Sequence, residues 1–319
     1  MTTSPVRATL DATPLDPAFA GFLAQAAAQG APPLEALPPP VARQVYRDLA
    51  NALGLPGPAI GKVEDKSIPG PGGVLPLRIY SPTTQGPWPV LLYVHGGGFV
   101  MGDLETHDEV CRTLCHLTGM LVVAVDYRLA PEHPFPAASD DAEAALRWIC
   151  VHADTLGGDP HRVAAAGDSA GAQLALVAVR RVQSPAVRAL GLIYPVAQHP
   201  DEPSPSYQEN DGKFLTKGVM QWFTASYLGG PSLTQPDHPD VALLKSELAA
   251  LPATWVATMG HDPLRDEGHA LALRAEAAGV LVAHQHYPSA IHACIHFSAV
   301  SPIGPQVLAD LAQWLRERA

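Results

Sequence analysis

Apolar and polar residues are arranged along the chain in a pattern that predicts strands and helices in alternation. Eight short apolar runs have the length of strands, and several show no polar alternation, which is typical of strands covered on both faces. The runs are 63–68, 74–80, 90–95, 121–127, a run from Val163 to Gly167, 190–194, 254–259 and 280–287. Helical patterns separate most of them. We therefore predict an α/β fold with a mostly parallel sheet of about eight strands and helices on both faces.

The helical patterns divide the chain into a short N-terminal segment and a main domain. The main-domain patterns cover 105–118, 136–153, a segment from Ala170 to Val182, 216–228, 263–278 and 302–318. Two others, 17–29 and 40–53, precede the first strand, and each begins at Pro and is followed by Gly. Residues 1–58 are too few for a core of their own, so we expect them to pack on a main domain of residues 59–319.

The alternation is interrupted at about 198–230. This insertion opens with a stretch rich in Pro, Ser and Asp and continues as an apolar helical pattern at 216–228. Long insertions between sheet elements often have a function, such as forming a lid over a site. A surface excursion with a packed helix explains the pattern equally well, and the sequence leaves both interpretations open.

The composition limits the kinds of partner that we expect this protein to bind. The 319 residues carry a formal net charge of −11, which disfavours nucleic acid and anionic membrane surfaces as partners. We find no signal peptide and no apolar run long enough to span a membrane, so we expect a cytoplasmic protein. The four cysteines, Cys111, Cys115, Cys150 and Cys294, complete no metal-ligand pattern. We therefore expect free thiols and neither metal nor cofactor.

A candidate nucleophile follows the apolar run that ends at Gly167. Ser169 lies in the motif GDSAG at 167–171, between a predicted buried strand and a predicted helix. A nucleophile at so sharp a turn needs flanking residues without side chains, and the helix directs N–H groups toward it. A glycine-rich turn with an incidental serine is the alternative interpretation.

A second glycine cluster follows another apolar run. The motif HGGGF at 95–99 lets the backbone approach a ligand and turn its amides toward it, as in an oxyanion hole. A phosphate-binding loop is less well supported, because no Gly-Lys-Ser or Gly-Lys-Thr follows.

A serine needs a base to accept its proton and an acid to orient that base, in the chain order Ser, acid, His for this architecture. Asp262, at the end of the 254–259 run, is the main candidate for the acid, although Asp before Pro is also an ordinary helix cap. Asp266 is the lesser candidate. Two histidines, His292 and His296, follow the last strand and compete for the role of base.

Five motifs together resemble the hormone-sensitive-lipase-like family of bacterial carboxylesterases, which have the α/β-hydrolase fold. They are HGGGF at 95–99, DYRLAPEHPFP at 126–136, GDSAG at 167–171, DPLRDEG at 262–268 and IH at 291–292. The resemblance implies that residues 59–319 form the catalytic domain. It also implies that residues 1–58 and the insertion at about 198–230 build a helical cap over the site.

The resemblance also implies a role for each motif. The nucleophile falls on Ser169, the acid on Asp262 and the base on His292. The amides that form the oxyanion hole would be those of Gly97, Gly98 and Ala170. One departure is evident, because the family usually has Gly-Phe after the base and this chain has Ala-Cys at 293–294.

The sequence therefore predicts a serine carboxylesterase that hydrolyses short- to medium-chain esters through an acyl-enzyme. A non-catalytic ligand-binding protein on the same scaffold, and an amidase or acyltransferase that uses the same three residues, are the alternatives. The sequence does not identify the natural substrate, the limit on acyl length, the enantioselectivity or the oligomeric state, for which a homodimer is one option.

Overall fold

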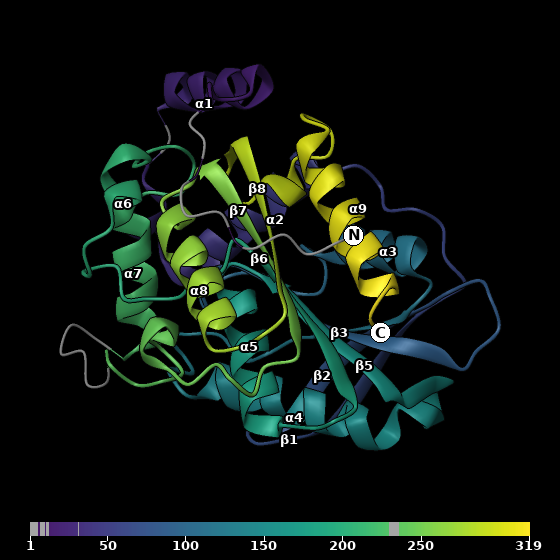
Figure 1. Ribbon diagram of the computed structural model, residues 1–319. Helices are drawn as coiled ribbons and strands as arrows, with labels where there is room; N and C mark the ends of the chain where they lie inside the picture. The colour runs from purple at the N-terminus through teal and green to yellow at the C-terminus, as the bar shows by residue number, and fades with distance from the viewer. Residues whose placement is uncertain (1–5, 7–9, 11–12, 31, 230–235) are drawn as a thin grey trace.

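The computed structural model describes residues 6, 10, 13–30, 32–229 and 236–319. Parts of the predicted N-terminal segment and Gly230, at the end of the predicted insertion, lie outside the described residues. Figure 1 shows a twisted central sheet with helices on both sides.

One sheet contains all the strands, and its order differs from the order in the sequence. The strands are β1 (Lys62–Gly70), β2 (Gly73–Ser81), β3 (Trp88–Val94), β4 (Leu121–Val125), β5 (Gly158–Asp168), β6 (Val187–Ile193), β7 (Ala253–His261) and β8 (Val282–Ile291). Their order is β1-β2-β4-β3-β5-β6-β7-β8. β2 is antiparallel to both β1 and β4, and the other neighbours are parallel. The predicted mostly parallel sheet of about eight strands is confirmed.

Helices cover both faces of this sheet. One layer contains α4 (Ala137–His152), α5 (Ala170–Val182) and α8 (Arg265–Ala277), and the other contains α3 (Asp108–Thr118) and α9 (Ile303–Arg316). β3 illustrates how the strands serve both layers. Val90, Leu92 and Val94 join the core beneath the first layer, while Leu91 and Tyr93 join the other. Because both faces are covered, the strand contains no polar residue.

The observed bounds differ from the predicted ones at the strand ends that carry candidate site residues. β8 continues to Ile291, beyond the predicted end at Tyr287, because an edge strand tolerates Pro288 and half-buried polar side chains that conceal the apolar pattern. α8 begins at Arg265, because Asp262 first accepts the backbone N–H of Leu264 at 2.8 Å. β7 also continues beyond the predicted run, to His261, so Asp262 and His292 each directly follow the last residue of a strand.

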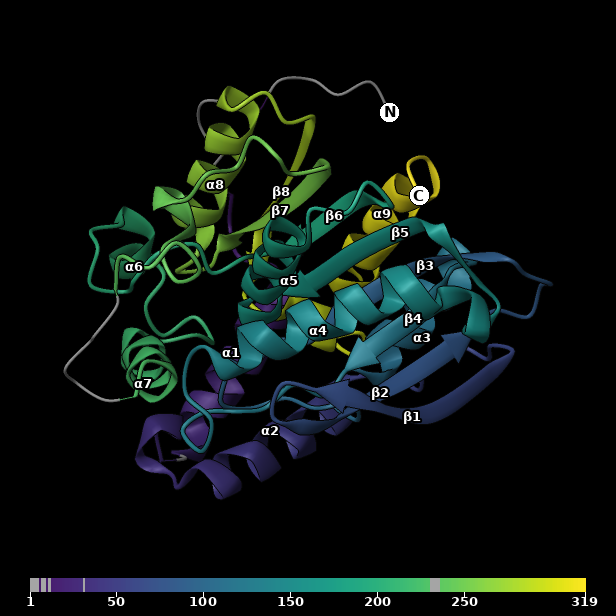
Figure 2. The same ribbon diagram turned by 90° about the horizontal axis from the view of Figure 1, so that it is seen from below.

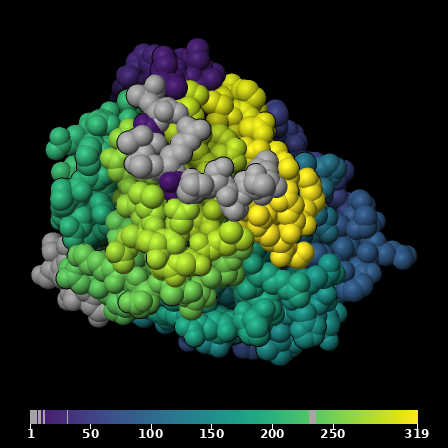
Figure 3. All heavy atoms as spheres, in the orientation of Figure 1, coloured from purple at the N-terminus to yellow at the C-terminus, as the bar shows by residue number. Residues whose placement is uncertain are grey.

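Four helices lie outside the alternation, and we call them the outer helices. They are α1 (Pro17–Gln29), α2 (Pro39–Leu53), α6 (Pro205–Glu209) and α7 (Lys217–Tyr227), of which the short α6 had no clear sequence pattern. In Figure 2 the arrowhead of β5 points toward the side where α1, α2 and α7 lie. In Figure 3 α1, in purple, projects at the top of the molecule beside the yellow-green C-terminal part of the chain. The outer helices therefore flank the carboxyl ends of the parallel strands.

Aromatic contacts attach α1 to the main domain. Phe19 is fully buried and meets Phe297 edge to face, with ring centroids 5.6 Å apart. Phe22 meets the same ring at 4.9 Å. Since Phe297 lies just beyond the end of β8, the N-terminal helix packs on the loop that carries the candidate histidines.

Candidate active site

Ser169 occupies a strained turn between β5 and α5. Its backbone has φ 53° and ψ −121°, a left-handed conformation that L-residues rarely adopt. The flanking glycines are required by close packing: a Cβ on Gly167 would lie 2.5 Å from the carbonyl oxygen of Val94, and one on Gly171 would lie 2.1 Å from it. The sequence therefore places a serine where the chain can turn only with glycine on either side.

Three candidate side chains meet at the strand ends. His292 Nε2 lies 3.0 Å from Ser169 Oγ, and His292 Nδ1 lies 2.8 Å from Asp262 Oδ2. All three residues are buried, with exposed fractions of 8% for Ser169, 5% for His292 and none for Asp262. An ionised carboxylate only accepts hydrogen bonds, so Nδ1 carries the imidazole proton and Nε2 is free to accept the serine proton. These contacts are those that an activated serine requires.

Asp262 serves two purposes in this arrangement. One carboxylate oxygen contacts His292, and the other accepts the N–H of Leu264 at the start of α8. Its backbone carbonyl accepts a hydrogen bond of 3.1 Å from Asn210 Nδ2. The helix-capping interpretation of Asp262 and the site interpretation are therefore compatible.

The two lesser candidates lie elsewhere. Asp266 accepts the N–H of Ser206 at 2.9 Å and contacts Arg265 at 2.7 Å, and neither bond involves a histidine. His296, in the short helix η4 (Cys294–His296), lies 3.2 Å from the hydroxyl of Tyr46 on α2. The structure thus brings His292, and not His296, to Ser169.

The glycine cluster after β3 lies in a left-handed turn beside Ser169. Gly97 has φ 118° and Gly98 has φ 62°, and a Cβ on Gly97 would lie 2.3 Å from the carbonyl oxygen of Met101. Within the described part of the chain, the backbone N–H groups of Gly97, Gly98 and Ala170 donate no backbone hydrogen bond. Three free amides beside a serine can stabilise a developing oxyanion.

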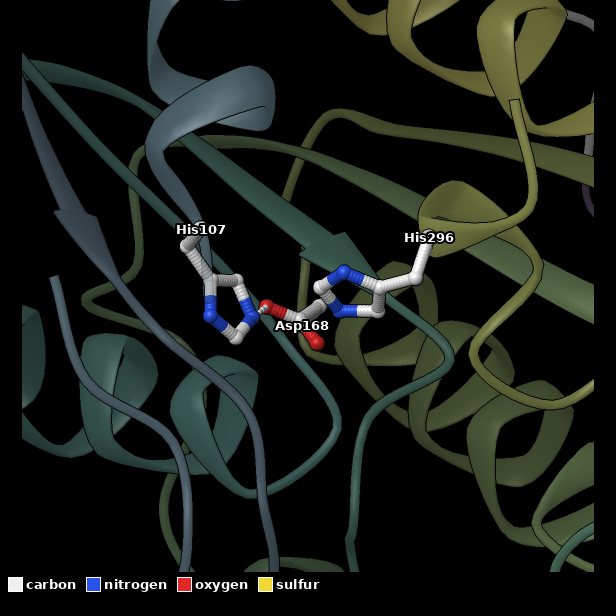
Figure 4. A group of neighbouring side chains, drawn as sticks. All are labelled: His107, Asp168 and His296. Carbon is white, nitrogen blue, oxygen red and sulfur yellow. Dashed lines mark ion pairs between the residues drawn. The ribbon is translucent and has the colours of Figure 1, made fainter. Parts of the chain in front are cut away.

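Asp168 lies beside Ser169 in a cluster that the sequence did not reveal. His107 and His296 approach its carboxylate from opposite sides (Figure 4). Asp168 Oδ1 accepts hydrogen bonds from the Tyr93 hydroxyl at 2.9 Å and from Gly96 N at 3.0 Å, and it lies 3.2 Å from His107 Nε2. The carboxylate therefore joins the start of the glycine turn to the turn that carries Ser169.

Further hydrogen bonds hold His107 in this cluster. Thr106 Oγ1 lies 2.9 Å from His107 Nδ1, and the backbone N of Gly96 lies 3.3 Å from His107 Nε2. Burial acts to raise the pKa of Asp168, but the charge of His107 and hydrogen bonds from His107 and Tyr93 lower it well below its usual range.

The same cluster is the group of described residues whose donor atoms could surround a metal ion. One donor atom each from His107, Asp168 and His296 lies within 4.8 Å of the others. However, Asp168 Oδ1 already has three donors, and both nitrogens of His107 are engaged. Burial and the charge of His107 also lower the pKa of His296 to about 3, so His296 is neutral. These contacts suit a hydrogen-bonded cluster better than a cation site.

A cavity of about 950 Å³ opens onto Ser169 and His292. Its walls are mainly apolar, and all four outer helices contribute to them. Examples are Phe22 of α1, Leu49 of α2, Tyr207 of α6 and Phe223 of α7. Phe223 also reaches the glycine turn, because a Cβ on Gly98 would lie 2.1 Å from its ring. The site can therefore hold a sizeable apolar group beside the serine.

Sequence reasoning missed the residues whose role depends on distant contacts. His107 and Tyr46 lie in stretches that carry no motif, and Asp168 was noted only as part of GDSAG. A charged residue next to Ser169, directly after the small apolar run from Val163 to Gly167, was the available signal. Its partners could not be identified, because Tyr93, Gly96 and His107 lie about 60 to 75 residues earlier in the chain.

Comparison with known proteins places this geometry in context. A family profile described as alpha/beta hydrolase fold matches residues 91–296. The chain is 42% identical over 248 residues to esterase LipI of Mycobacterium tuberculosis. The aligned region covers 76% of this chain and 77% of that protein. It is 34% identical over 256 residues to ethyl acetate hydrolase of Pseudomonas putida. This aligned region covers 77% of this chain and 79% of that protein.

Solved structures extend the likeness to almost the whole chain. A hyperthermophilic esterase from the archaeon Pyrobaculum calidifontis aligns with a TM-score of 0.91 at 36% identity, and the alignment covers 96% of this chain and 99% of that chain. A thermostable esterase from Pseudomonas putida aligns with a TM-score of 0.88 at 31% identity, over 97% of this chain and 98% of that chain. The match therefore includes the outer helices as well as the sheet.

Proposed function

The chain belongs to the alpha/beta hydrolase family and is a carboxylic ester hydrolase, and on that premise we propose that Ser169, His292 and Asp262 carry out the reaction. The observation that supports this assignment is the continuous line of hydrogen bonds, 3.0 Å and 2.8 Å long, that joins three side chains from the ends of β5, β7 and β8. No other serine among the described residues makes such a contact with a histidine. With an esterase as the premise, the non-catalytic alternative is set aside.

In the proposed mechanism Ser169 Oγ attacks the ester carbonyl carbon while His292 Nε2 takes the hydroxyl proton. The carbonyl π electrons move to the oxygen, and the amides of Gly97, Gly98 and Ala170 donate hydrogen bonds to this oxyanion. Asp262 holds the imidazole and stabilises its positive charge. His292 then gives the proton to the leaving alcohol as the C–O bond breaks. Water, deprotonated by the same nitrogen, releases the acid from Ser169.

We also propose that the outer helices form a cap, with residues 1–58 and about 198–230 as its two parts. The apolar cavity walls that α1, α2 and α7 supply support this division. A cavity of about 950 Å³ is compatible with short- and medium-chain esters. Activity measured across p-nitrophenyl esters from acetate to dodecanoate would find the length limit.

We propose that the protein acts in the cytoplasm, because a reducing compartment keeps cysteines such as these four as free thiols. In the part of the chain that the structure describes, no helix combines the length and the apolar character that a membrane span needs. Sedimentation of the purified protein would decide between a monomer and a homodimer.

The test of the assignment is Ser169→Ala. Its kcat for p-nitrophenyl butanoate should fall by about 10⁴-fold or more, and labelling by a fluorophosphonate probe should disappear. Ser301→Ala is the control, because Ser301 is also buried but lies outside the cavity lining. Retained activity or labelling in Ser169→Ala would refute the nucleophile. If His296→Ala lost more activity than His292→Ala, the choice of base would be reversed.

A further inference from the structure

The charges on the cavity walls have one sign. Among the described residues that line the cavity, none is Lys or Arg, and two are acidic: Glu35 and Asp168. An anionic group that enters this cavity therefore meets no compensating positive side chain. The remaining wall is mainly apolar, which strengthens the effect of any charge within it.

The acids near the cavity differ in how they are compensated. Asp168 lies against His107, with 3.2 Å between Oδ1 and Nε2, and accepts two further hydrogen bonds. Glu267 lies behind Tyr207, which lines the cavity, and burial raises the pKa of Glu267 to about 8. Glu267 is therefore neutral at neutral pH, and these two residues place little net charge in the cavity.

Glu35 is different. It lies in the short helix η1 (Leu34–Ala36), which joins α1 to α2, and its Oε2 atom is buried with no hydrogen-bond partner. Within the described part of the chain, no cationic side chain forms an ion pair with it. A buried carboxylate oxygen without a partner is costly, and its presence calls for a reason.

The neighbouring helix leaves room for this carboxylate. A Cβ on Gly218 would lie 2.4 Å from Glu35 Oε1, so the glycine in the first turn of α7 lets the two segments approach. The positive end of a helix also favours a charged carboxylate. The Glu35 carboxylate thus lies where η1 meets the first turn of α7, and its Oε2 atom has no hydrogen-bond donor.

We propose that Glu35 is a specificity-determining residue that favours esters with a positively charged group, such as an ammonium, at the end remote from the ester bond. The same carboxylate disfavours esters that carry a second carboxylate. The inference rests on the proposed function, because it assumes that the ester reacts at Ser169 in this cavity. The apolar walls would hold the methylene chain, and the ammonium would pair with the Glu35 carboxylate.

The experiment compares p-nitrophenyl esters of equal length whose acyl chains end in methyl, ammonium or carboxylate, from butanoate to octanoate. For wild type, kcat/KM should be about ten-fold or more higher for the ammonium ester than for the carboxylate ester at the best length. In Glu35→Gln this ratio should fall by about ten-fold, mainly through KM. In Glu35→Lys it should invert. Equal ratios in wild type and Glu35→Gln would overturn the proposal.

Glu247→Gln is the matched control. It removes the same charge from an exposed residue outside the cavity lining, so it reports the effect of the overall charge of −11 on charged substrates. A ratio that shifts equally in Glu35→Gln and Glu247→Gln would overturn a local role for Glu35. Thermal melts of both variants identify a merely structural role, which would lower the melting temperature without changing the ratio. Wild type that fails to hydrolyse even the methyl ester would instead refute the proposed function.

Discussion

The floor of the site and the wall above it are built by different means. The floor consists of the strand-end loops that carry Ser169, Asp262 and His292, and its side chains are buried and joined by hydrogen bonds of 2.8 to 3.0 Å. The wall comes from outer helices that are lightly attached: α1 buries only Phe19 among its residues, and α2 buries only Ala42. The comparison suggests that the chemistry depends on rigid strand ends, whereas the choice of substrate depends on helices that can vary with little effect on the fold.

The largest effect should come from the floor. Asp262→Asn keeps the shape of the side chain but can donate a hydrogen bond to His292 Nδ1, which favours the wrong tautomer for accepting the serine proton. We expect kcat to fall by about 10³-fold with little change in KM. Asp266→Asn, in the first turn of α8, is the control and should remain within a few-fold of wild type. A mild effect of Asp262→Asn would show that the strand-end loops tolerate substitution as well as the outer helices do.

The next effect should come from beneath the floor. Asp168→Asn leaves His107 without its countercharge and loosens the link between the Gly96 amide and the turn that carries Ser169. We expect a fall in kcat of about 10- to 100-fold at nearly constant KM, because an oxyanion hole acts on the transition state. The affinity for a boronic acid transition-state analogue should fall in parallel. A change confined to KM would show that Asp168 does not support the groups that stabilise the transition state.

The wall should respond differently. Phe223→Ala removes a ring that packs on the glycine turn and lines the cavity. We expect the preference among p-nitrophenyl esters to shift by about three- to ten-fold toward longer or branched acyl chains, since each added methylene group that is buried contributes about 0.8 kcal/mol. Trp222→Ala, on the same helix but outside the cavity lining, is the control. A uniform loss of activity on all esters would mean that the Phe223 ring holds the glycine turn in place rather than selecting the substrate.

The smallest effect concerns the residue after the base. Ala293 has φ 61°, a left-handed conformation that glycine adopts more readily and that the family usually fills with glycine. Ala293→Gly should relieve about 1 to 2 kcal/mol of backbone strain and lose about 0.4 to 1 kcal/mol through the freer unfolded chain. A net gain of about 0.5 to 1 kcal/mol in the free energy of unfolding follows, measured by urea denaturation. A net loss would mean that the Ala293 methyl group packs favourably in the floor.

The sequence alone determined much of this protein. Strands buried on both faces need continuous apolar residues, so the sheet was readable from runs such as 90–95 and 163–167. The serine turn was readable too, because only glycine can flank it at such close approach. The motifs around Ser169, Gly97 and Asp262 are local in sequence, and local geometry constrains which residues they can contain.

Only the tertiary structure decided the rest. His292 and His296 are four residues apart, and the distances that separate their roles depend on how β8 and η4 pack against β5 and α2. The countercharge of Asp168 comes from His107, just before α3, and the carboxylate of Glu35 lies against α7. These contacts join segments far apart in the chain. No local pattern encodes them, because each depends on the packing of whole elements rather than on the conformation of neighbouring residues.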